Sequence, residues 1–216
     1  MRYRAVLFDF DGTLLDTLRD LAESVNSVLI RSGFPEHSLE AYRHFVGEGI
    51  EELARRVLPE GHRDEATITK TLTDVRQEYR QRWPNHTRPY EGIPELLDAL
   101  TARRVKMAIV TNKPDDSTRT MAARLLPRWK FDVIVGATTE MPRKPDPKGA
   151  LEAARLLRLS PEAILYVGDS DIDMKTANAA GMYPVGVLWG FRLADELIRN
   201  GAKVLIRKPL ELLELL

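Results

Sequence analysis

Short apolar runs alternate with segments of helical period along most of the chain. The runs are rich in β-branched and aromatic residues, which favours buried strands. They occupy residues 5–8, 105–110, 131–136, 163–168, 184–189 and 203–206. Because strands that alternate with helices form parallel sheets covered on both faces, the pattern predicts an α/β fold. A last run, "LELLELL", predicts an amphipathic helix at the C-terminus.

The segment 17–88 interrupts this alternation, because it holds helical patterns and no strand pattern. Apolar residues recur at helical spacing over 18–28, 50–58 and 68–83. These helices either pack directly on the sheet or form a separate cap, with "TRPYEGIP" (87–94) as the return hinge. The segment is far longer than a crossover connection requires, which favours the cap. We therefore predict a Rossmann-like parallel-sheet core, residues 1–16 and 89–216, with an inserted all-helical cap domain, residues 17–88.

Composition excludes several classes of protein. Lys plus Arg and Asp plus Glu both number 32, so the net charge is zero and no nucleic-acid partner is expected. The absence of cysteine excludes disulfides, thiolate metal sites and cysteine nucleophiles. No apolar stretch is long enough for a signal peptide or a membrane span. We expect a soluble cytoplasmic protein, monomeric or homodimeric, with no membrane partner.

Polar residues with chemical potential follow four of the predicted strands. Asp9 and Asp11 follow the first, Thr111 the second, Lys144 the third, and Asp169 with its neighbours the fourth. Because ligands of parallel sheets bind beyond the carboxyl ends of the strands, these groups are expected at one edge.

This set of side chains suits a phosphate ester and a metal ion. Clustered carboxylates bind a hard cation such as Mg²⁺, which would also offset the repulsion between Asp9 and Asp11. A hydroxyl, a lysine and free backbone amides suit a phosphoryl group. A carboxylate beside that group can attack it and form an aspartyl-phosphate.

Four segments of the chain resemble the four motifs of the haloacid dehalogenase (HAD) superfamily. They are "DFDGTLLDT" from Asp9, "TNKP" from Thr111, the segment around Lys144, and "GDSDIDM" from Gly168. Their order and spacing are those of the phosphatases of this superfamily, and the resemblance extends from Ala5 to the C-terminus.

The resemblance implies two different roles for the first two aspartates. Asp9 would be the nucleophile and a metal ligand. Asp11 would be the general acid and base and would offer its backbone carbonyl to the metal, to which Asp169 would bind directly. Adjacent acids in unlike surroundings can divide these tasks, because one must be ionised and the other protonated.

The resemblance also implies the residues around the phosphoryl group. Gly12, Thr111, the amide of Asn112 and Lys144 would bind it, and Lys144 would neutralise charge on the nucleophile and the phosphate. Ser170 and Asp173 would support these groups, with Asp173 orienting Lys144 or a metal-bound water. Residues 189–191, "WGF", follow a strand and could line this site or pack in the core.

Within the superfamily, the sequence is most similar to the phosphoglycolate phosphatase group. The dehalogenases lack an acid at the position of Asp11, and P-type ATPases have a lysine where this chain has Phe10. The similar segments include "FVGEGIEELARR", in which Gly47, Glu48 and Gly49 would form the cap loop over the leaving group. Glu48 stands where an anionic leaving group would prefer a cation, although Arg55 and Arg56 are close in sequence.

We therefore predict a Mg²⁺-dependent phosphomonoester hydrolase that acts through an aspartyl-phosphate. The expected substrate is 2-phosphoglycolate or a similar small phosphorylated metabolite. A sugar-phosphate phosphatase, a mutase or a pyrophosphatase of the same superfamily is the alternative, although a mutase would require a cation in the cap loop. From another class, the alternative is a phospho-accepting signalling or binding protein without turnover. A receiver domain would be about half as long and would have no cap.

Overall fold

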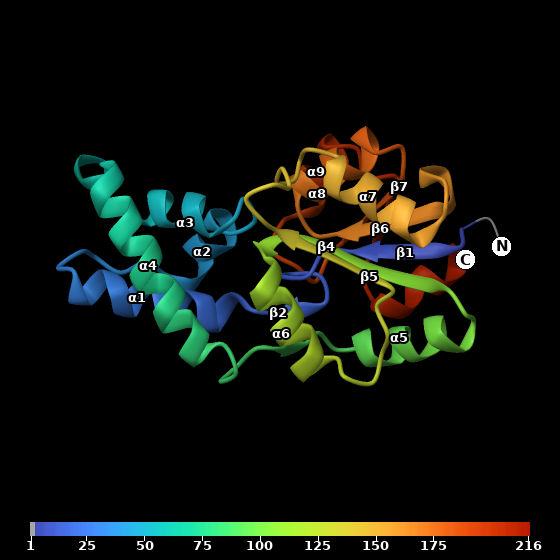
Figure 1. Ribbon diagram of the computed structural model, residues 1–216, viewed down its shortest axis with the longest axis horizontal. Helices are drawn as coiled ribbons and strands as arrows, with labels where there is room; N and C mark the ends of the chain where they lie inside the picture. The colour runs from blue at the N-terminus through green and yellow to red at the C-terminus, as the bar shows by residue number, and fades with distance from the viewer. Residues whose placement is uncertain (1–2) are drawn as a thin grey trace. The chain divides into compact units, whose positions relative to one another are not determined.

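The computed structural model describes residues 3–216, which divide into two compact units. The first unit runs up to Leu15 and resumes from Pro89 to Leu216, and the second is Asp16–Arg88. Figure 1 shows the elements of both units, which are described in turn.

The first unit is built on a six-stranded parallel sheet, so the prediction of a Rossmann-like α/β fold is confirmed. Its strands in chain order are β1 (Ala5–Phe8), β4 (Lys106–Pro114), β5 (Val133–Ala137), β6 (Ile164–Gly168), β7 (Tyr183–Val187) and β8 (Val204–Ile206). Their spatial order is β5-β4-β1-β6-β7-β8. The four strands that precede the predicted site residues are therefore neighbours, and β1 lies in their middle.

Helices cover both faces of this sheet, as Figure 1 shows. They are α5 (Ile93–Ala102) and α6 (Asp115–Leu125) on one face, and α7 (Lys148–Leu157), α8 (Asp171–Ala179) and α9 (Ala194–Arg199) on the other. A one-turn 3₁₀ helix, η2 (Pro161–Ala163), precedes β6. Alanines of α7 pack against Leu7, Ala108 and Tyr166 of the central strands. Every residue of β1 is completely buried, because this strand is covered on both faces.

Strand β4 extends beyond the predicted end at Val110. It pairs with β5 through Pro114, with a shift in register between Val110 and Pro114. The polar residues Thr111, Asn112 and Lys113 are thus part of the strand, because the irregular pairing accommodates side chains that a regular buried ladder would exclude.

The C-terminal segment forms the 3₁₀ helix η3 (Pro209–Glu214), which lies where the sequence predicted an amphipathic helix. A 3₁₀ helix has three residues per turn, which places Pro209, Leu212 and Leu215 on one face. Pro209 and Leu212 are buried, and the segment packs against α5.

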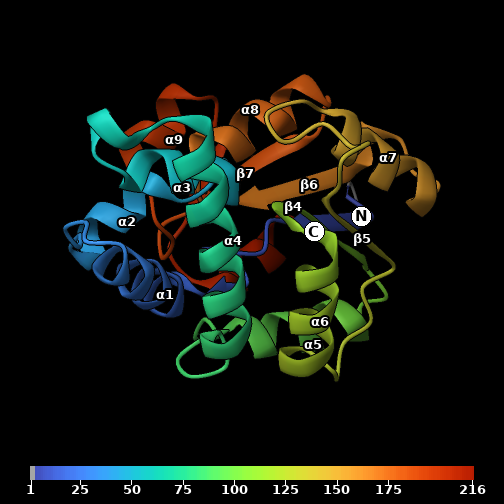
Figure 2. The same ribbon diagram turned by 60° about the vertical axis from the view of Figure 1, so that its left-hand side comes forward.

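The second unit is all-helical. Its helices are α1 (Leu18–Arg31), α2 (Leu39–Phe45), α3 (Ile50–Val57), the 3₁₀ turn η1 (Glu60–His62) and α4 (Glu65–Arg82). Helices α1 and α4 lie side by side, and they bury Val25, Val28 and Val75 (Figure 2). The sequence pattern did not predict α2, because Tyr42 is its one buried residue and it has no apolar stripe.

A buried carboxylate closes the second unit near its two ends. Asp20, on α1, is fully buried and accepts hydrogen bonds from the backbone N–H groups of His86 and Thr87 at 2.9 and 2.7 Å. The Thr87 hydroxyl donates a third bond at 2.8 Å. Next to these residues, the connecting strands β2 (Leu15–Asp16) and β3 (Arg88–Pro89) form a two-stranded sheet. The outgoing and returning chain are therefore joined by specific hydrogen bonds.

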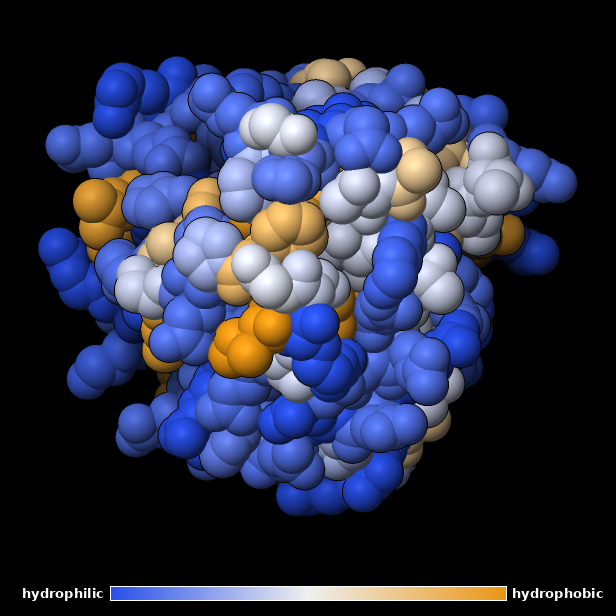
Figure 3. Space-filling view, turned by 90° about the vertical axis from the view of Figure 1, so that its left-hand side faces the viewer, coloured by the Kyte–Doolittle hydropathy of each residue, from blue (hydrophilic) through white to orange (hydrophobic). Residues whose placement is uncertain are grey.

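The outer surface is predominantly polar on the face drawn in Figure 3, where hydrophobic residues form small groups. Across residues 3–216, each helix is too short or too polar to span a bilayer.

Candidate active site

Asp9 directly follows β1 at the carboxyl edge of the sheet. Its backbone N–H donates to the carbonyl of Val167 on β6 at 2.9 Å, which continues the strand pairing for one more residue. Its carboxylate accepts a hydrogen bond from the N–H of Phe10 at 2.7 Å and forms an ion pair with Lys144 at 2.8 Å. Both contacts involve Oδ1, so the carboxylate is held in one orientation.

Lys144 is buried and its ammonium lies between two carboxylates. Its Nζ is 2.8 Å from Asp9 and 2.7 Å from Asp173. The backbone of Lys144 is fixed by the side chain of Asn112, which accepts from its N–H at 2.8 Å and donates to its carbonyl at 3.0 Å. The sequence prediction concerned only the backbone amide of Asn112, and the structure adds this second contact between β4 and the lysine loop.

Asp173 is fully buried and serves as a bridge between Lys144 and the start of α8. Its Oδ2 accepts from the Ser170 hydroxyl at 2.6 Å and from the Ser170 N–H at 3.1 Å, while the Ser170 hydroxyl caps the N–H of Asp173. The Tyr166 hydroxyl lies 3.5 Å from Oδ1. Ser170 and Asp173 therefore form a capping box that also orients the lysine.

Asp169 is held by groups from two distant segments. The Thr13 hydroxyl donates to Oδ1 at 3.1 Å and the Phe191 N–H donates to Oδ2 at 2.8 Å. A Cβ on Gly12 or on Gly190 would lie 2.3 or 2.2 Å from atoms of the Asp169 side chain, so only glycine fits at either position. The N–H of Gly12 donates to the Leu15 carbonyl at 2.9 Å, which commits this amide to the turn.

The segment 189–191 thus contacts site residues, a question that the sequence left open. Besides the Phe191 contact, the Trp189 indole donates to the carbonyl of Thr13 at 3.0 Å. Phe191 itself is buried, so the segment packs in the core and also supports Asp169.

Asp9, Asp169 and Asp173 form a cluster in which one carboxylate oxygen of each lies within 4.8 Å of the others. Burial raises the pKa of Asp9 well above its usual range, and the charge of Asp173 adds to this effect while Lys144 opposes it. Burial and the Asp173 charge raise the pKa of Asp169 to about 7. Burial also lowers the pKa of Lys144, but the charges of Asp173 and Asp9 more than compensate, so its ammonium form is favoured.

This cluster fits a divalent cation. Three ionised carboxylates and the Lys144 ammonium sum to two negative charges, and every potential ligand atom is a hard oxygen. Burial is the main cause of the raised carboxyl pKa values and the charge of Asp173 adds to them; a bound cation would oppose both effects by favouring the ionised carboxylates.

Asp11 has different surroundings from Asp9. Its side chain is 18% exposed, and both of its carboxylate oxygens face Lys113, at 3.1 and 3.3 Å from the ammonium. The carboxylate of Asp11 is thus outside the acidic cluster. Lys113 was not among the predicted site residues.

Thr111 and Asn112 lie buried on β4, the strand that pairs with β1. The Thr111 hydroxyl accepts from the N–H of Lys113 at 3.2 Å. The structure therefore brings the predicted core residues to one edge of the sheet, and it includes Lys113 in the same group.

The predicted cap loop, residues 47–49, belongs to the second unit. Gly47 and Gly49 have φ of 123° and 96°, conformations that favour glycine. Glu48 is paired with Arg56, which also contacts Glu52 at 3.0 Å. The negative charge of Glu48 is therefore neutralised inside its own unit.

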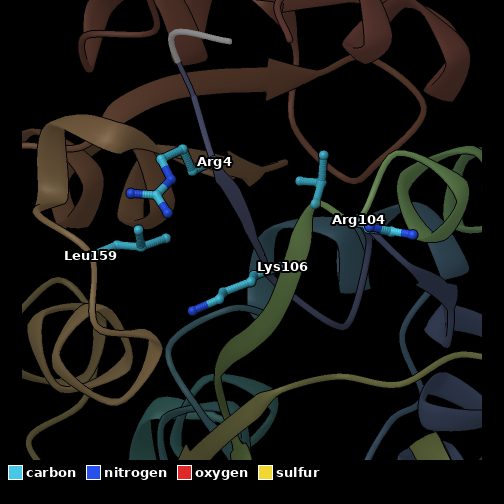
Figure 4. Close-up of a pocket in the computed structure, with 5 residues that line it drawn as sticks. Arg4, Arg104, Lys106 and Leu159 are labelled. Atoms are coloured by element: carbon cyan, nitrogen blue, oxygen red, sulfur yellow. The ribbon is translucent and has the colours of Figure 1, made fainter.

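A cavity of about 270 Å³ lies at the opposite, amino-terminal edge of the same sheet. Figure 4 shows Arg4 and Lys106 on one side of it around Leu159, whereas Arg104 points away from them. The amine of Lys106 donates to the carbonyl of Leu157 at 2.7 Å. The basic groups of this cavity do not converge on one point, and the acidic residues of the candidate site lie at the other end of the strands. The cavity is therefore not part of the candidate active site.

A family model described as haloacid dehalogenase-like hydrolase matches residues 6–187. The chain belongs to this family.

Its relatives include phosphoglycolate phosphatases. The chain is 36% identical to the phosphoglycolate phosphatase of Pseudomonas putida over 194 residues, which cover 87% of this chain and 70% of the relative. It is 33% identical to the phosphoglycolate phosphatase of Xanthomonas campestris, covering 99% and 97% of the two chains. A crystal structure of a predicted phosphoglycolate phosphatase from Haemophilus somnus superposes with a TM-score of 0.92 at 26% identity, covering 100% and 98%.

These findings confirm three predictions made from the sequence: the superfamily, the likeness to the phosphoglycolate phosphatase group, and a hydrolytic enzyme of the phosphatase type.

Proposed function

We propose that the chain hydrolyses a small phosphomonoester, with 2-phosphoglycolate as the preferred substrate, in a Mg²⁺-dependent reaction that passes through an aspartyl-phosphate on Asp9. The observation that carries this proposal is the pairing of two aspartates with two lysines, Asp9 with Lys144 and Asp11 with Lys113, at one sheet edge. The phosphoglycolate phosphatases that share a third of its sequence support the choice of substrate.

In the first half-reaction, a carboxylate oxygen of Asp9 attacks phosphorus and the bond from phosphorus to the leaving oxygen breaks. Asp11 donates a proton to that oxygen, so that a neutral alcohol departs. Lys144 lies within hydrogen-bond distance of Asp9 and offsets negative charge on the nucleophile and the phosphoryl oxygens.

In the second half-reaction, water attacks the phosphorus of the acyl phosphate and Asp11 accepts its proton. The bond between phosphorus and the Asp9 oxygen breaks, which releases inorganic phosphate and restores both carboxyl groups. Asp9 and Asp169, with the backbone carbonyl of Asp11, would hold Mg²⁺, which supplies positive charge opposite the phosphoryl oxygens. Asp173 keeps Lys144 in position through the 2.7 Å ion pair.

Thr111 and the amide of Asn112 would bind the phosphoryl oxygens, since the two residues lie on the strand beside β1. Gly12, which has no side chain, would allow the backbone to approach the phosphoryl group closely. The cap loop of Gly47, Glu48 and Gly49 would contribute to selectivity among leaving groups, because Thr111, Asn112 and Lys144 would contact only the phosphoryl group that all substrates share.

The test is a panel of phosphomonoesters assayed with Mg²⁺ and with excess chelator, ranked by kcat/KM. The proposal expects 2-phosphoglycolate to rank above sugar phosphates and pyrophosphate, and activity to disappear with chelator. A sugar phosphate at the top would replace the substrate and keep the reaction. Full turnover in chelator would refute the metal requirement, and binding of phosphate esters without release of phosphate would refute the enzyme.

A further inference from the structure

Lys113 pairs with Asp11 at the sheet edge, but the steps of the proposed hydrolysis give its positive charge no role of its own. Its side chain is only 7% exposed, and its ammonium contacts both carboxylate oxygens of Asp11, 102 positions away in sequence. Burying a lysine is costly unless its charge is compensated, so such a residue usually has a specific role. The other lysine of the site, Lys144, is already held between Asp9 and Asp173.

The backbone of β4 holds Lys113 firmly at this position. Its N–H donates to the Thr111 hydroxyl at 3.2 Å, and the Thr118 hydroxyl donates to the neighbouring carbonyl of Pro114 at 2.9 Å. The side chain of Asn112, which lies between Thr111 and Lys113 in sequence, forms hydrogen bonds with the backbone of Lys144. Successive residues of the strand therefore contact different parts of the site: Asn112 contacts the backbone of Lys144, and Lys113 contacts Asp11.

The position of Lys113 corresponds to the leaving-group side of the reaction. A general acid must lie within about 3 Å of the oxygen that it protonates. Because the Lys113 ammonium is 3.1 Å from an Asp11 oxygen, an ester oxygen bound to that atom lies within about 6 Å of the ammonium. In a phosphorylated 2-hydroxy acid, the carboxylate is one carbon away from this ester oxygen, which is close enough to contact the ammonium directly.

The cap loop offers no comparable cation. Residues 46–49 include no Lys or Arg, and the nearby Arg56 is paired with both Glu48 and Glu52. Within its own unit, Lys113 is therefore the candidate positive partner for an anionic leaving group.

We infer that Lys113 determines specificity by binding the carboxylate of a phosphorylated hydroxy acid while Asp11 serves the bridging oxygen of the same molecule. This inference rests on the proposed function, and it assigns the recognition of the leaving group's charge to the core. Lys113 would thereby favour carboxylate-bearing phosphate esters, with a chain length like that of 2-phosphoglycolate, over neutral esters of equal size.

The experiment compares 2-phosphoglycolate with its neutral amide, phosphoglycolamide. Binding is measured by calorimetry in Asp9→Asn protein, which keeps the ligands intact, and kcat/KM is measured in protein with Asp9. Each measurement is made with Lys113, Lys113→Met and Lys113→Arg. Lys106→Met is the matched control, since this lysine starts the same strand at the opposite edge, near Arg4 and Leu159 (Figure 4).

Lys113→Met should weaken binding of 2-phosphoglycolate about ten- to a hundredfold, the usual effect of a hydrogen bond to a charged group, and should change binding of the amide about threefold or less. Its effect on turnover through Asp11 is common to both esters and cancels in the ratio of their kcat/KM values. Lys113→Arg should keep most of the preference for the carboxylate, and Lys106→Met should keep all of it.

Two results would overturn the inference. Equal weakening of both ligands would mean that Lys113 acts only through Asp11, and the proposed function would stand if 2-phosphoglycolate is still turned over. Equal binding and turnover of the two esters by the protein with Lys113 would show that the carboxylate is not recognised. Conversely, a carboxylate-specific loss of binding in protein that hydrolyses neither ester would support the inference and refute the proposed function.

Discussion

The two units of the molecule hold their charged residues in opposite ways. At the sheet edge, Asp9, Lys144 and Asp173 are nearly inaccessible, and they come from segments far apart in sequence. In the helical unit, most ion pairs join residues one turn apart on exposed helix surfaces, such as Arg19 with Glu23 at 2.9 Å. Exposed pairs contribute little to stability, typically below about 1 kcal/mol, whereas buried ones are costly to disrupt. Substitutions at the sheet edge should therefore affect chemistry strongly, and substitutions in the helical unit should affect selectivity moderately.

The largest effect is expected for Asp9→Asn. The amide cannot serve as the nucleophile, so kcat should fall by about 10⁴-fold or more. Steady-state release of phosphate measures it, with Asp171→Asn as the control, because Asp171 lies in the same region and pairs with the neighbouring Lys175 on α8. Near-normal turnover in Asp9→Asn would remove Asp9 from the mechanism.

Asp11→Asn should have an effect that depends on the leaving group. A general acid typically contributes about 10²- to 10⁴-fold when the departing oxygen needs a proton. With p-nitrophenyl phosphate the loss should be smaller, because p-nitrophenolate departs without protonation. The ratio of the losses for the two substrate types is the measurement. Equal losses would contradict the acid role, although they would leave a structural role for the contact with Lys113.

Glu48→Gln tests the helical unit and should change the order of substrates without changing the need for a cation. Contacts of this kind discriminate between small substrates by about 1–3 kcal/mol, or about ten- to a hundredfold in relative kcat/KM. Glu52→Gln is the matched control, since Glu52 also pairs with Arg56 but lies outside the loop. An unchanged ranking in both Glu48→Gln and Gly49→Val would place selectivity elsewhere.

The smallest effect concerns pH and the cation. The carboxyl pKa values of Asp9 and Asp169 are higher in the folded cation-free protein than in the unfolded chain, so the folded state binds more protons. The contribution of these two carboxyl groups to the free energy of unfolding is therefore greatest below about pH 4, and it decreases as the pH rises toward about 7. Mg²⁺ should reverse this loss, so its effect on Tm should increase by a few degrees from pH 5 to pH 8.

Scanning calorimetry with and without Mg²⁺ at the two pH values measures this difference. Asp169→Asn should abolish the response, and Asp171→Asn should retain it. An identical Mg²⁺ effect at pH 5 and pH 8 would mean that these carboxylates do not hold the cation.

The sequence predicted the sheet, and the edge at which its polar residues gather, because both depend on local patterns. Each of the six apolar runs of the core forms a strand, and the predicted polar residues lie on or after the ends of four of them, β1, β4, β5 and β6. The contacts that sequence alone missed join side chains across long distances in the chain. Asn112 holds the backbone of Lys144, and Lys113 reaches Asp11, yet both residues are adjacent to the predicted Thr111. Both contacts depend on the continuation of β4 past Val110. The local sequence does not show this continuation, because it depends on pairing with β5.

The contacts of Asp20 have a consequence for how such a chain can vary. With its carboxylate bound to the N–H groups of His86 and Thr87, the helical unit closes upon itself beside the point where it joins the sheet. An insertion whose two ends meet leaves and re-enters the host domain at neighbouring points, so its two junctions with the sheet unit lie together. We predict that transplanting residues 17–88 between related enzymes would exchange the part of substrate preference that the proposed cap loop sets, and would leave the recipient's Lys113 and acidic cluster in place.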